Sequence, residues 1–363
     1  MRKVDFVIIG GGPAGLSAAH KAAEAGLSSV VIERDDKVGG QLVKQTHMFF
    51  GSKKQYAKTR GIDIANILIG HCKAHDDLIE IMTNTTVTGL YDDYILTLLT
   101  DDVYHKIEAK AILVASGASE KFMLFENNDL PGIYGAGAVQ TLMNVYGVLP
   151  GEEVVMVGSG NIGLIVSYQL LQAGVRVKMV IEAASQIGGY KVHASKIKRL
   201  GVDILTNHTV KRAIGDDTLQ KVEIVEVDDQ WNMIEGTEKI IECDALCISV
   251  GLSPLSTILG MLPVKMKYVG KLGGNVPVID YHHETTMNNI FVAGDVCGVE
   301  EASSAIVEGS IAGLFIANRL GYKHPEYEKE MNDLTQQLEN LRSGPFGVKT
   351  VEGLRELRGE NDV

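Results

Sequence analysis

The chain has 363 residues, which is enough for two or three domains and for a large hydrophobic core. Its formal net charge of −12 argues against nucleic-acid binding, because proteins of that class present a basic face. The four cysteines are too few and too scattered for a secreted disulfide scaffold, so we expect a cytoplasmic protein. Glycine is overrepresented, with 40 residues, about 11% of the chain against a usual ~7%.

The first elements follow a strand–turn–helix–strand pattern. A β-branched strand over residues 4–9 leads into Gly10-x-Gly12-x-x-Gly15, and an alanine-rich helix over residues 16–25 follows, with Gly26 as its C-cap. A second buried strand, residues 30–33, then ends on Glu33. A glycine motif in this context is typical of a dinucleotide-binding unit.

Further strands are expected before the middle of the chain. Residues 81–87 and 94–100 alternate as the strands of a hairpin, and Asp101-Asp102 is typical of a tight turn. Residues 110–117 form an apolar run that ends in small residues, as in a buried strand.

The opening pattern then recurs. A strand over residues 154–157 leads into Gly158-x-Gly160-x-x-Gly163, a helix ends at Gly174, and a strand over 177–182 ends on Glu182. The first glycine lies 16 residues before the C-cap glycine in both copies, and 23 or 24 residues before the acid. Residues 154–175 carry no charge and are long enough to span a bilayer, but their glycines favour a buried strand–turn–helix, so we expect no membrane span.

Each glycine in the motif has a physical role. The first permits the tight turn, the second lets the backbone approach a pyrophosphate, and the third lets helix and strand pack closely. The helix N-terminus attracts the phosphates, and the acid accepts from ribose hydroxyls. The candidate nucleotide-binding residues are therefore Gly10, Gly12, Pro13, Ala14, Gly15 and Glu33 in the first copy, and Gly158, Gly160, Asn161, Ile162, Gly163 and Glu182 in the second.

The remaining elements repeat the arrangement of the first half. Strands are expected over residues 221–227, 238–242 and 244–251, and a further buried strand over 290–295 precedes a small-residue helix over 302–320. A polar helix over 326–341 carries an apolar stripe that favours packing on its own domain, and a polar tail follows.

At this point the chain resembles the two-dinucleotide-binding-domain flavoproteins, the pyridine nucleotide-disulfide oxidoreductase superfamily of thioredoxin reductase and glutathione reductase. The resemblance covers about residues 4–322. It rests on four motifs: Gly10-Gly11-Gly12-Pro13-Ala14-Gly15, Gly39-Gly40-Gln41-Leu42, Ala115-Ser116-Gly117-Ala118 and Val292-Ala293-Gly294-Asp295-Val296.

The resemblance implies the fold class and the cofactors. The fold is an α/β fold with two Rossmann-like three-layer (ββα) domains. A discontinuous FAD-binding domain would cover residues 1–122 and 270–325, an NAD(H)-binding domain 123–269, and a C-terminal helix and tail 326–363. Beyond the glycine motifs, it assigns Arg34, Gly40, Gln41, Ala115, Ser116, Gly117, Gly294 and Asp295 to FAD, and Gly251 to NAD.

The chain departs from its namesakes where their redox disulfides lie. Residues 41–50 and 130–139 contain no cysteine, so the electron acceptor is expected outside this chain. Residues 130–143 and 147–151 resemble the α subunits of heteromeric sarcosine oxidase and related amino-acid or opine dehydrogenases. This branch implies a partner that is a second flavoprotein or an iron–sulfur protein, and self-association into a homo-oligomer stays open.

Two residues are candidates for catalysis, each with a structural alternative. His47 is either a proton donor or a satisfied polar group in an aromatic segment, and Cys297 either approaches the flavin or is a buried apolar residue. Cys243 and Cys247, four residues apart, are expected to be buried small hydrophobic residues, with a functional pair as the alternative; Cys72 has no expected role, and no spacing predicts a metal site.

The predicted function is an FAD-dependent, NADH-linked oxidoreductase without a redox disulfide. NADH is favoured over NADPH because Glu182-Ala183-Ala184-Ser185-Gln186 offers an acid and no base to a 2′-phosphate. The alternatives are an α-subunit-like component of a heteromeric sarcosine, amino-acid or opine dehydrogenase, and a non-catalytic flavin-binding subunit.

Overall fold

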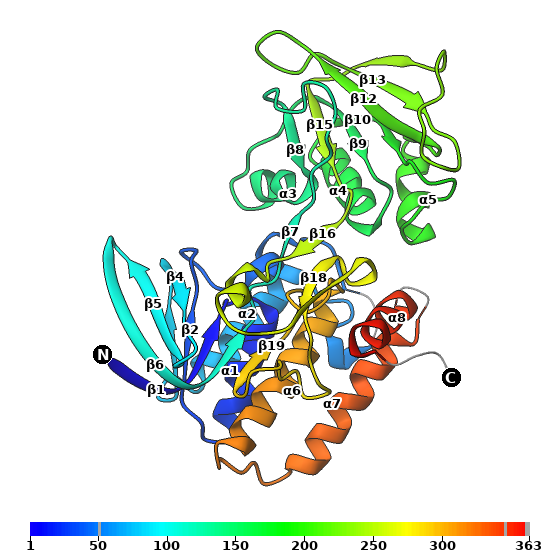
Figure 1. Ribbon diagram of the computed structural model, residues 1–363. Helices are drawn as coiled ribbons and strands as arrows, with labels where there is room; N and C mark the ends of the chain where they lie inside the picture. Colours follow the sequence, from blue (N-terminus) through cyan, green and yellow to red (C-terminus); the bar gives the residue numbers. More distant parts are fainter. Residues whose placement is uncertain (50–51, 345–346, 360–363) are drawn as a thin grey trace. The chain divides into compact units, whose positions relative to one another are not determined.

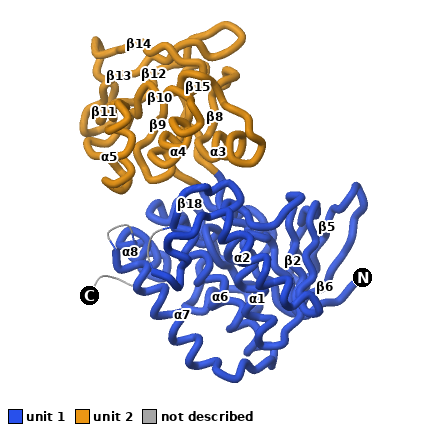
Figure 2. Tube along the Cα trace, turned by 180° about the vertical axis from the view of Figure 1, so that it is seen from behind, with its two compact units in different colours: residues 1–119, 253–363 blue, residues 120–252 orange. Residues whose placement is uncertain are grey.

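The structure is a computed structural model that describes residues 1–49, 52–344 and 347–359. The chain forms two compact units (Figure 2): a first unit of residues 1–119 and 253–363, and a second unit of residues 120–252. It passes between them through β7 (Ala118–Glu120) and β16 (Leu252–Pro254), which pair with each other. Residues 253–269, assigned above to the NAD(H)-binding domain, lie in the first unit, because Leu259, Leu262 and Val264 join its core.

The first unit is built on a seven-stranded sheet (Figure 1). Its parallel part has the order β3-β2-β1-β6, with β19 beside β6, and β6 continues into an antiparallel meander with β5 and β4. The strands are β1 (Arg2–Ile9), β2 (Ser29–Ile32), β3 (Ile79–Met82), β4 (Thr85–Leu90), β5 (Ile95–Thr100), β6 (Val103–Val114) and β19 (Ile290–Val292).

Alternate residues of the parallel strands face two different layers. Phe6 and Ile8 pack in a core with helices α1 (Pro13–Glu24), α2 (Gly61–Lys73) and α6 (Ala302–Arg319). Val7 and Ile9 belong to a second core with the meander and residues 259–279. Because both faces are covered, β1 is an apolar run rather than an alternating one, and the unit has three layers.

Helices α1 and α6 approach each other closely. A Cβ added at Gly309 would lie 2.0 Å from the Ala14 carbonyl oxygen, and one added at Gly313 would lie 2.2 Å from that of Ala18. Both distances are far below van der Waals contact, so only glycine permits this crossing. The small-residue composition of the predicted helix over 302–320 is thereby explained.

The second unit repeats the three-layer plan. Its parallel sheet has the order β11-β10-β9-β15-β8, and a separate meander contains β12, β13 and β14. Its elements are β8 (Ile133–Gly135), α3 (Ala136–Asn144), β9 (Glu153–Val157), α4 (Asn161–Gln172), β10 (Arg176–Ile181), α5 (Lys191–Arg199), β11 (Asp203–Leu205), β12 (His208–Ile214), β13 (Lys221–Glu226), β14 (Lys239–Glu242) and β15 (Ala245–Ile248). The predicted fold class is confirmed.

The C-terminal region folds onto the first unit. Helix α7 (Tyr327–Arg342) places its apolar stripe, with Leu334 and Leu338, against α6, as the sequence predicted. Helix α8 (Gly347–Arg358) was not expected in the polar tail; it forms because Leu354 and Leu357 are buried in the same core as β17 (Met266–Val269) and β18 (Gly274–Pro277). Residues 345–346 and 360–363 of that tail lie outside the described residues.

Two local expectations had different outcomes. The single strand expected over residues 81–87 is wrong: β3 ends at Met82 and β4 begins at Thr85, because Asn84 adopts a left-handed φ of 49° between them. The turn at Asp101-Asp102 is confirmed, since both residues have positive φ, 48° and 61°, as a two-residue hairpin turn requires. Among the described residues no helix is both long enough and apolar enough to cross a membrane.

The α1–α6 crossing gives a stability prediction. We expect Gly309→Ala to lower the free energy of unfolding by ~1–3 kcal/mol, because the added methyl group collides with backbone that cannot move aside. Gly70→Ala in α2 is the matched control: a Cβ there meets nothing within 4 Å, so better helix propensity should leave stability unchanged or raise it by up to ~1 kcal/mol. Urea unfolding measures the stability of both variants. Equal stability of the two variants would contradict the close approach of α1 and α6.

Candidate functional site

The first glycine motif lies at the carboxyl end of β1, and its three glycines face different surroundings. A Cβ added at Gly10, which has a φ of +107°, would lie 2.4 Å from the Ala115 carbonyl oxygen, and one at Gly15 would lie 2.0 Å from that of Gly10. The nearest atom to a Cβ added at Gly12 would be the Gly40 Cα, at 3.9 Å. The first and third glycines therefore serve packing, and the second leaves room for a ligand at the start of α1.

Glu33 follows β2 and reaches back to this turn. Its buried carboxylate accepts from the Gly11 N–H at 2.8 Å and from the Asp35 N–H at 3.0 Å. A carboxylate has about four acceptor positions, so two remain for the hydroxyls of a ribose. Arg34, in contrast, is exposed, and its guanidinium lies 3.7 Å from the Asp35 carboxylate.

A second glycine turn covers the first. The Gly39 N–H donates to the Gly11 carbonyl oxygen at 2.7 Å, and a Cβ added at Gly40 would lie 2.9 Å from the Gly12 Cα. Both residues have positive φ, 122° and 52°. Gln41, in the short 3₁₀ helix Gly40–Lys44 that follows, is exposed.

The ends of β6 and β19 complete the edge of the sheet. The Ala115 N–H donates to the Ile9 carbonyl oxygen at 2.8 Å, the Ser116 hydroxyl donates to that of Leu255 at 2.8 Å, and Gly117 has a φ of +74°. A Cβ added at Gly294, with a φ of +80°, would lie 3.1 Å from the Ala14 Cβ. The turn after β19 thus lies beside the first turn of α1.

Asp295 has an unusual electrostatic environment. Burial raises the pKa of its carboxyl to about 7, and the Glu308 and Glu300 carboxylates add to this rise. The Glu300 N–H, which donates to Oδ1 at 3.2 Å, lowers the pKa and so opposes the rise. Near neutral pH the group can therefore be either a proton donor or a charged acceptor.

The second glycine motif has the same geometry at the end of β9. A Cβ added at Gly158 would lie 2.1 Å from the Ser249 carbonyl oxygen, and one at Gly163 would lie 2.2 Å from that of Gly158. A Cβ at Gly160 would meet nothing within 4 Å. Asn161 and Ile162 begin α4 directly behind this open space.

Glu182 is held more fully than Glu33. One carboxylate oxygen accepts from both the N–H and the hydroxyl of Ser159, at 2.9 and 2.7 Å, and the other accepts from the Ala184 N–H at 3.0 Å. One acceptor position therefore remains where Glu33 has two. Gly251, with a φ of +105°, follows β15, and its carbonyl oxygen accepts from the Lys121 N–H at 2.9 Å.

The second unit also has a covering turn, which was not predicted from the sequence. The Gly189 N–H donates to the Ser159 carbonyl oxygen at 2.8 Å, and the Tyr190 N–H donates to the Asn161 side chain at 2.8 Å. Gly188 and Gly189 stand six and seven residues after Glu182, as Gly39 and Gly40 stand after Glu33. That shared spacing was the signal that would have found them.

The two candidate catalytic residues have different neighbours. Cys297 is buried, and its thiol donates to the Gly294 carbonyl oxygen at 3.1 Å; burial and then the Glu308 carboxylate raise its pKa well above the ordinary value. His47 is half-buried, and its ring stacks on that of Phe49 at 5.9 Å. Cys297 is thus poorly suited to act as a thiolate.

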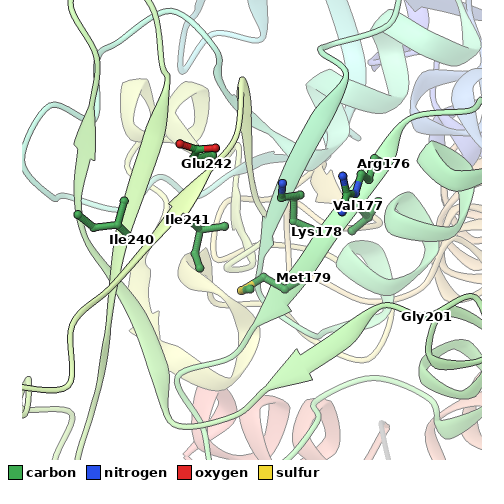
Figure 3. A pocket seen from close by; sticks show the side chains of 8 residues that line it. All are labelled: Arg176, Val177, Lys178, Met179, Gly201, Ile240, Ile241 and Glu242. Carbon is green, nitrogen blue, oxygen red and sulfur yellow. The ribbon is translucent and has the colours of Figure 1, made fainter.

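A surface pocket of about 540 Å³ lies elsewhere in the second unit. Figure 3 shows its lining, which includes Arg176, Lys178 and Met179 of β10 and Ile241 and Glu242 of β14. It opens on the amino-terminal half of β10, whereas the glycine motif and Glu182 lie at the carboxyl ends of the strands. Ligands of open α/β sheets bind at the carboxyl ends, so this pocket is not the nucleotide site.

Among the described residues, two groups of side chains have metal-ligating atoms within 4.8 Å of one another: His283, Cys297 and Glu308, and Glu24, His324 and Glu330. A positive side chain pairs with a carboxylate of each group. Arg342 pairs with Glu308, and the Lys21 ammonium lies 2.6 and 2.8 Å from Glu24 and Glu330. These positive charges occupy the role that a metal ion would have.

The two Rossmann-type units, each with a glycine turn and an acid at the carboxyl edge of a parallel sheet, define a two-domain dinucleotide-binding oxidoreductase. The chain belongs to the pyridine nucleotide-disulphide oxidoreductase family, whose model matches residues 4–309. Proteins of this family use FAD and NAD(P)H, and the two units of this chain are built to hold these cofactors.

The curated relatives are named as subunits of larger enzymes. The chain is 25% identical to the HcnB subunit of hydrogen cyanide synthase of Pseudomonas protegens, over 87% of this chain and 70% of that protein. It is 27% identical to the alpha subunit of sarcosine oxidase of Corynebacterium sp., over 88% of this chain, and 23% identical to an opine oxidase subunit of Agrobacterium tumefaciens, over 85%. The matched regions cover 33% and 64% of those two relatives.

Solved structures show the same fold. L-proline dehydrogenase from P. horikoshii matches with a TM-score of 0.67 and 25% identity, over 91% of this chain and 59% of that chain. Thioredoxin reductase of T. acidophilum matches with a TM-score of 0.72 and 23% identity, over 88% of this chain and 99% of that chain.

The cysteines give a reactivity prediction. All four are free and buried, and burial raises the pKa of Cys72 and of Cys243 to about 12. We expect the folded protein to react with a thiol reagent such as DTNB only slowly at mildly alkaline pH, and all four thiols to react in guanidinium chloride. One fast equivalent in the folded protein that Cys297→Ser removes would instead identify a reactive thiol at Cys297.

Proposed function

We propose that this chain is the FAD- and NAD(H)-binding subunit of a heteromeric oxidoreductase and passes electrons to an acceptor outside the chain. The observation that carries the proposal is the state of the cysteines: all four are free and buried, and none lies in residues 41–50 or 130–139. Between NAD(H) and FAD, the bound cofactors supply hydride-transfer chemistry. The relatives named as enzyme subunits support an acceptor on a partner.

In the proposal the first unit holds FAD. The open space at Gly12, the free N–H groups at the start of α1 and the two remaining acceptor positions of Glu33 fit the pyrophosphate and the ribose of its ADP part. Asp295 and the turn after β19 would bond the ribityl or pyrophosphate region. The N-terminus of α6, which begins at Ala302, would favour negative charge on reduced flavin.

The second unit would hold NADH in preference to NADPH. Glu182 is fixed at the end of β10 by Ser159 and Ala184, so a 2′-phosphate on the bound nucleotide would face a carboxylate. The basic residues of β10, Arg176 and Lys178, lie at its other end and pair with Glu153. Nothing on this strand therefore offers a positive charge where the extra phosphate would lie.

Two other functions follow from the same fold. In the first, a partner subunit oxidises an amine or amino acid and this chain receives the electrons; the relatives named sarcosine oxidase and opine oxidase support it. In the second, the chain binds flavin without turnover. The proposal is supported if the isolated chain oxidises NADH steadily with an artificial acceptor. The first alternative is supported if activity appears only after co-purification with a partner. The second is supported if the protein binds FAD that NADH never bleaches.

The nucleotide preference is directly testable. In anaerobic stopped-flow mixing, we expect NADH to reduce the bound FAD faster than NADPH, and Glu182→Ala to narrow this ratio by about tenfold, equivalent to ~1.4 kcal/mol. Glu153→Ala is the matched control, because it removes an acid from the same sheet at the opposite end of the strands and should leave the ratio unchanged. Faster reduction by NADPH in the unmodified protein would overturn the assignment.

The open space at the second glycine gives a separate test. We expect Gly160→Ala to fold with an unchanged melting temperature and to weaken NADH binding at least about tenfold, because its methyl group fills the place of the pyrophosphate. Gly163→Ala should instead lower the melting temperature, since its Cβ collides with the Gly158 carbonyl oxygen. Calorimetric titration and thermal melts separate the two effects; undiminished binding to Gly160→Ala would place the nucleotide elsewhere.

A further inference from the structure

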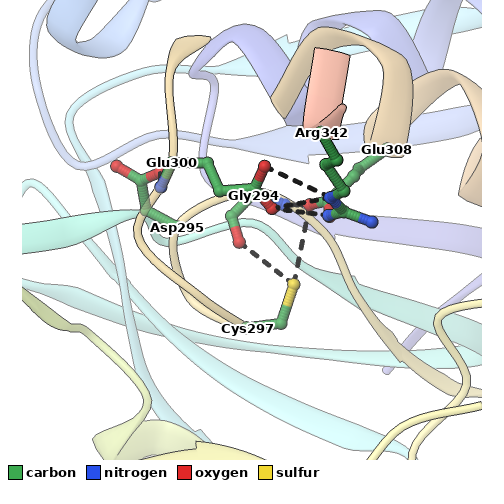
Figure 4. A network of polar contacts seen from close by, with 6 residues as sticks. All are labelled: Gly294, Asp295, Cys297, Glu300, Glu308 and Arg342. Atoms are coloured by element: carbon green, nitrogen blue, oxygen red, sulfur yellow. Dashed lines mark hydrogen bonds and ion pairs between the residues drawn. The ribbon is translucent and has the colours of Figure 1, made fainter. Parts of the chain in front are cut away.

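A buried ion-pair network joins α7 to the turn after β19. Arg342, the last residue of α7, donates from Nε to the two carboxylate oxygens of Glu300 at 3.1 and 3.2 Å, and from a terminal nitrogen to Glu300 at 2.5 Å. The same terminal nitrogen donates to Glu308 of α6. Figure 4 shows the guanidinium in contact with Glu300, with Glu308 beside it. All three side chains are at most 12% exposed.

Both carboxyl-bearing residues continue the network to the residues proposed for FAD. The second oxygen of Glu308 accepts from the Gly294 N–H at 2.8 Å, and the Cys297 thiol lies 3.6 Å from the same oxygen. The Glu300 N–H donates to Asp295 at 3.2 Å. Arg342 is therefore one hydrogen-bonded residue away from Gly294 and from Asp295 (Figure 4).

The charge balance makes Arg342 the decisive member. Two buried carboxylates face one guanidinium, and burial raises the pKa of Glu300 while Arg342 opposes that rise. Removing one partner of a buried ion pair leaves an uncompensated charge, which is far more costly than the pair itself. Without Arg342, Glu300 and Glu308 would have to take up protons, move, or admit water, and the turn bonded to them would move with them.

The position of α7 does not depend on this contact alone. Its apolar side chains, including Leu334 and Leu338, pack with Val307, Ile311 and Leu314 of α6. After α7, helix α8 is fixed by buried Leu354 and Leu357 and by an ion pair between Lys271 and Glu352 at 2.9 Å. The scaffold that presents Arg342 is thus folded by hydrophobic packing, outside the family match that ends at residue 309.

We propose that Arg342 is a positioning residue for the flavin: through Glu308 and Glu300 it holds the Gly294–Asp295 turn in the geometry that binds FAD. The inference rests on the proposed function, in which this turn contacts FAD. It assigns to the C-terminal helix α7 a part in building the cofactor site, although α7 itself supplies no residue assigned to FAD.

The test compares Arg342→Gln and Arg342→Lys with the control Arg319→Gln. Arg319 ends α6 and pairs with Glu284 at 2.6 Å. The control therefore also removes an ion pair from the first unit, but this pair contacts neither Gly294 nor Asp295. Apoprotein is titrated with FAD while flavin fluorescence, visible circular dichroism and the apoprotein melting temperature are recorded. We expect Arg342→Gln to raise the Kd for FAD at least about tenfold, equivalent to ~1.4 kcal/mol, and to alter the flavin dichroism.

The conservative variant separates positioning from stability. Arg342→Lys keeps the charge and loses the forked geometry, so we expect an intermediate Kd. Arg319→Gln should keep the Kd and the dichroism even where its melting temperature falls. Should Arg342→Gln fail to fold, the double variant Glu300→Gln/Arg342→Met removes one charge of each sign, keeps the net charge of the network, and is expected to fold and bind FAD more weakly.

The outcomes distinguish failure of the proposed function from failure of the positioning role of Arg342. If the unmodified protein binds no FAD, the proposed function is wrong. If it binds FAD and the folded Arg342 variants bind with the same Kd and the same dichroism, the proposed function stands and the positioning role of Arg342 is wrong.

Discussion

The structure of the first unit depends on how closely α1 is enclosed by its neighbours. Added Cβ atoms at Gly15 of α1 and at Gly309 of α6 would both lie 2.0 Å from a backbone oxygen, so α1 contacts the end of β1 on one side and α6 on the other at distances that only glycine permits. The start of α1 is consequently fixed at the carboxyl edge of the sheet, next to Gly294. Backbone atoms fill the Cβ positions of Gly10 and Gly15, whereas the nearest atom to the Cβ position of Gly12 is the Gly40 Cα at 3.9 Å.

The second unit uses the same solution with two differences. Its third glycine, Gly163, approaches Gly158 as Gly15 approaches Gly10. Its first glycine, Gly158, approaches Ser249 at the end of β15, as Gly10 approaches Ala115 at the end of β6. Ser159 stands where the first copy has Gly11, and its hydroxyl takes one acceptor position of the Glu182 carboxylate. The first unit gains β19 and α6 from a later part of the chain, and with them Asp295 and the buried carboxylates. The copies thus share the geometry of the glycine turn and differ in what surrounds it.

Both glycine motifs could be predicted from the sequence, because the turn, the helix and the acid are determined by spacings within about 24 residues, and the fold class followed from the family resemblance that these and other motifs carry. Features that depend on distant contacts could not. Helix α8 has a polar composition and is held by Leu354 and Leu357 in a core built mainly by earlier segments. Asn84 interrupts an expected strand through a left-handed conformation that composition does not reveal. The network joins Arg342 to Glu308, 34 positions away, and to Glu300, 42 positions away, so no local sequence pattern predicts it.

The buried charges around Asp295 bear on the direction in which electrons leave the proposed flavin. Glu300 and Glu308 share the Arg342 guanidinium, and Asp295 lies beside them, where it accepts from the Glu300 N–H. Negative charge disfavours reduced, anionic flavin, whereas the N-terminus of α6 favours it. Burial raises the pKa of the Asp295 carboxyl to about 7, so in the proposal protonation of this group near neutral pH would favour reduced flavin bound beside it.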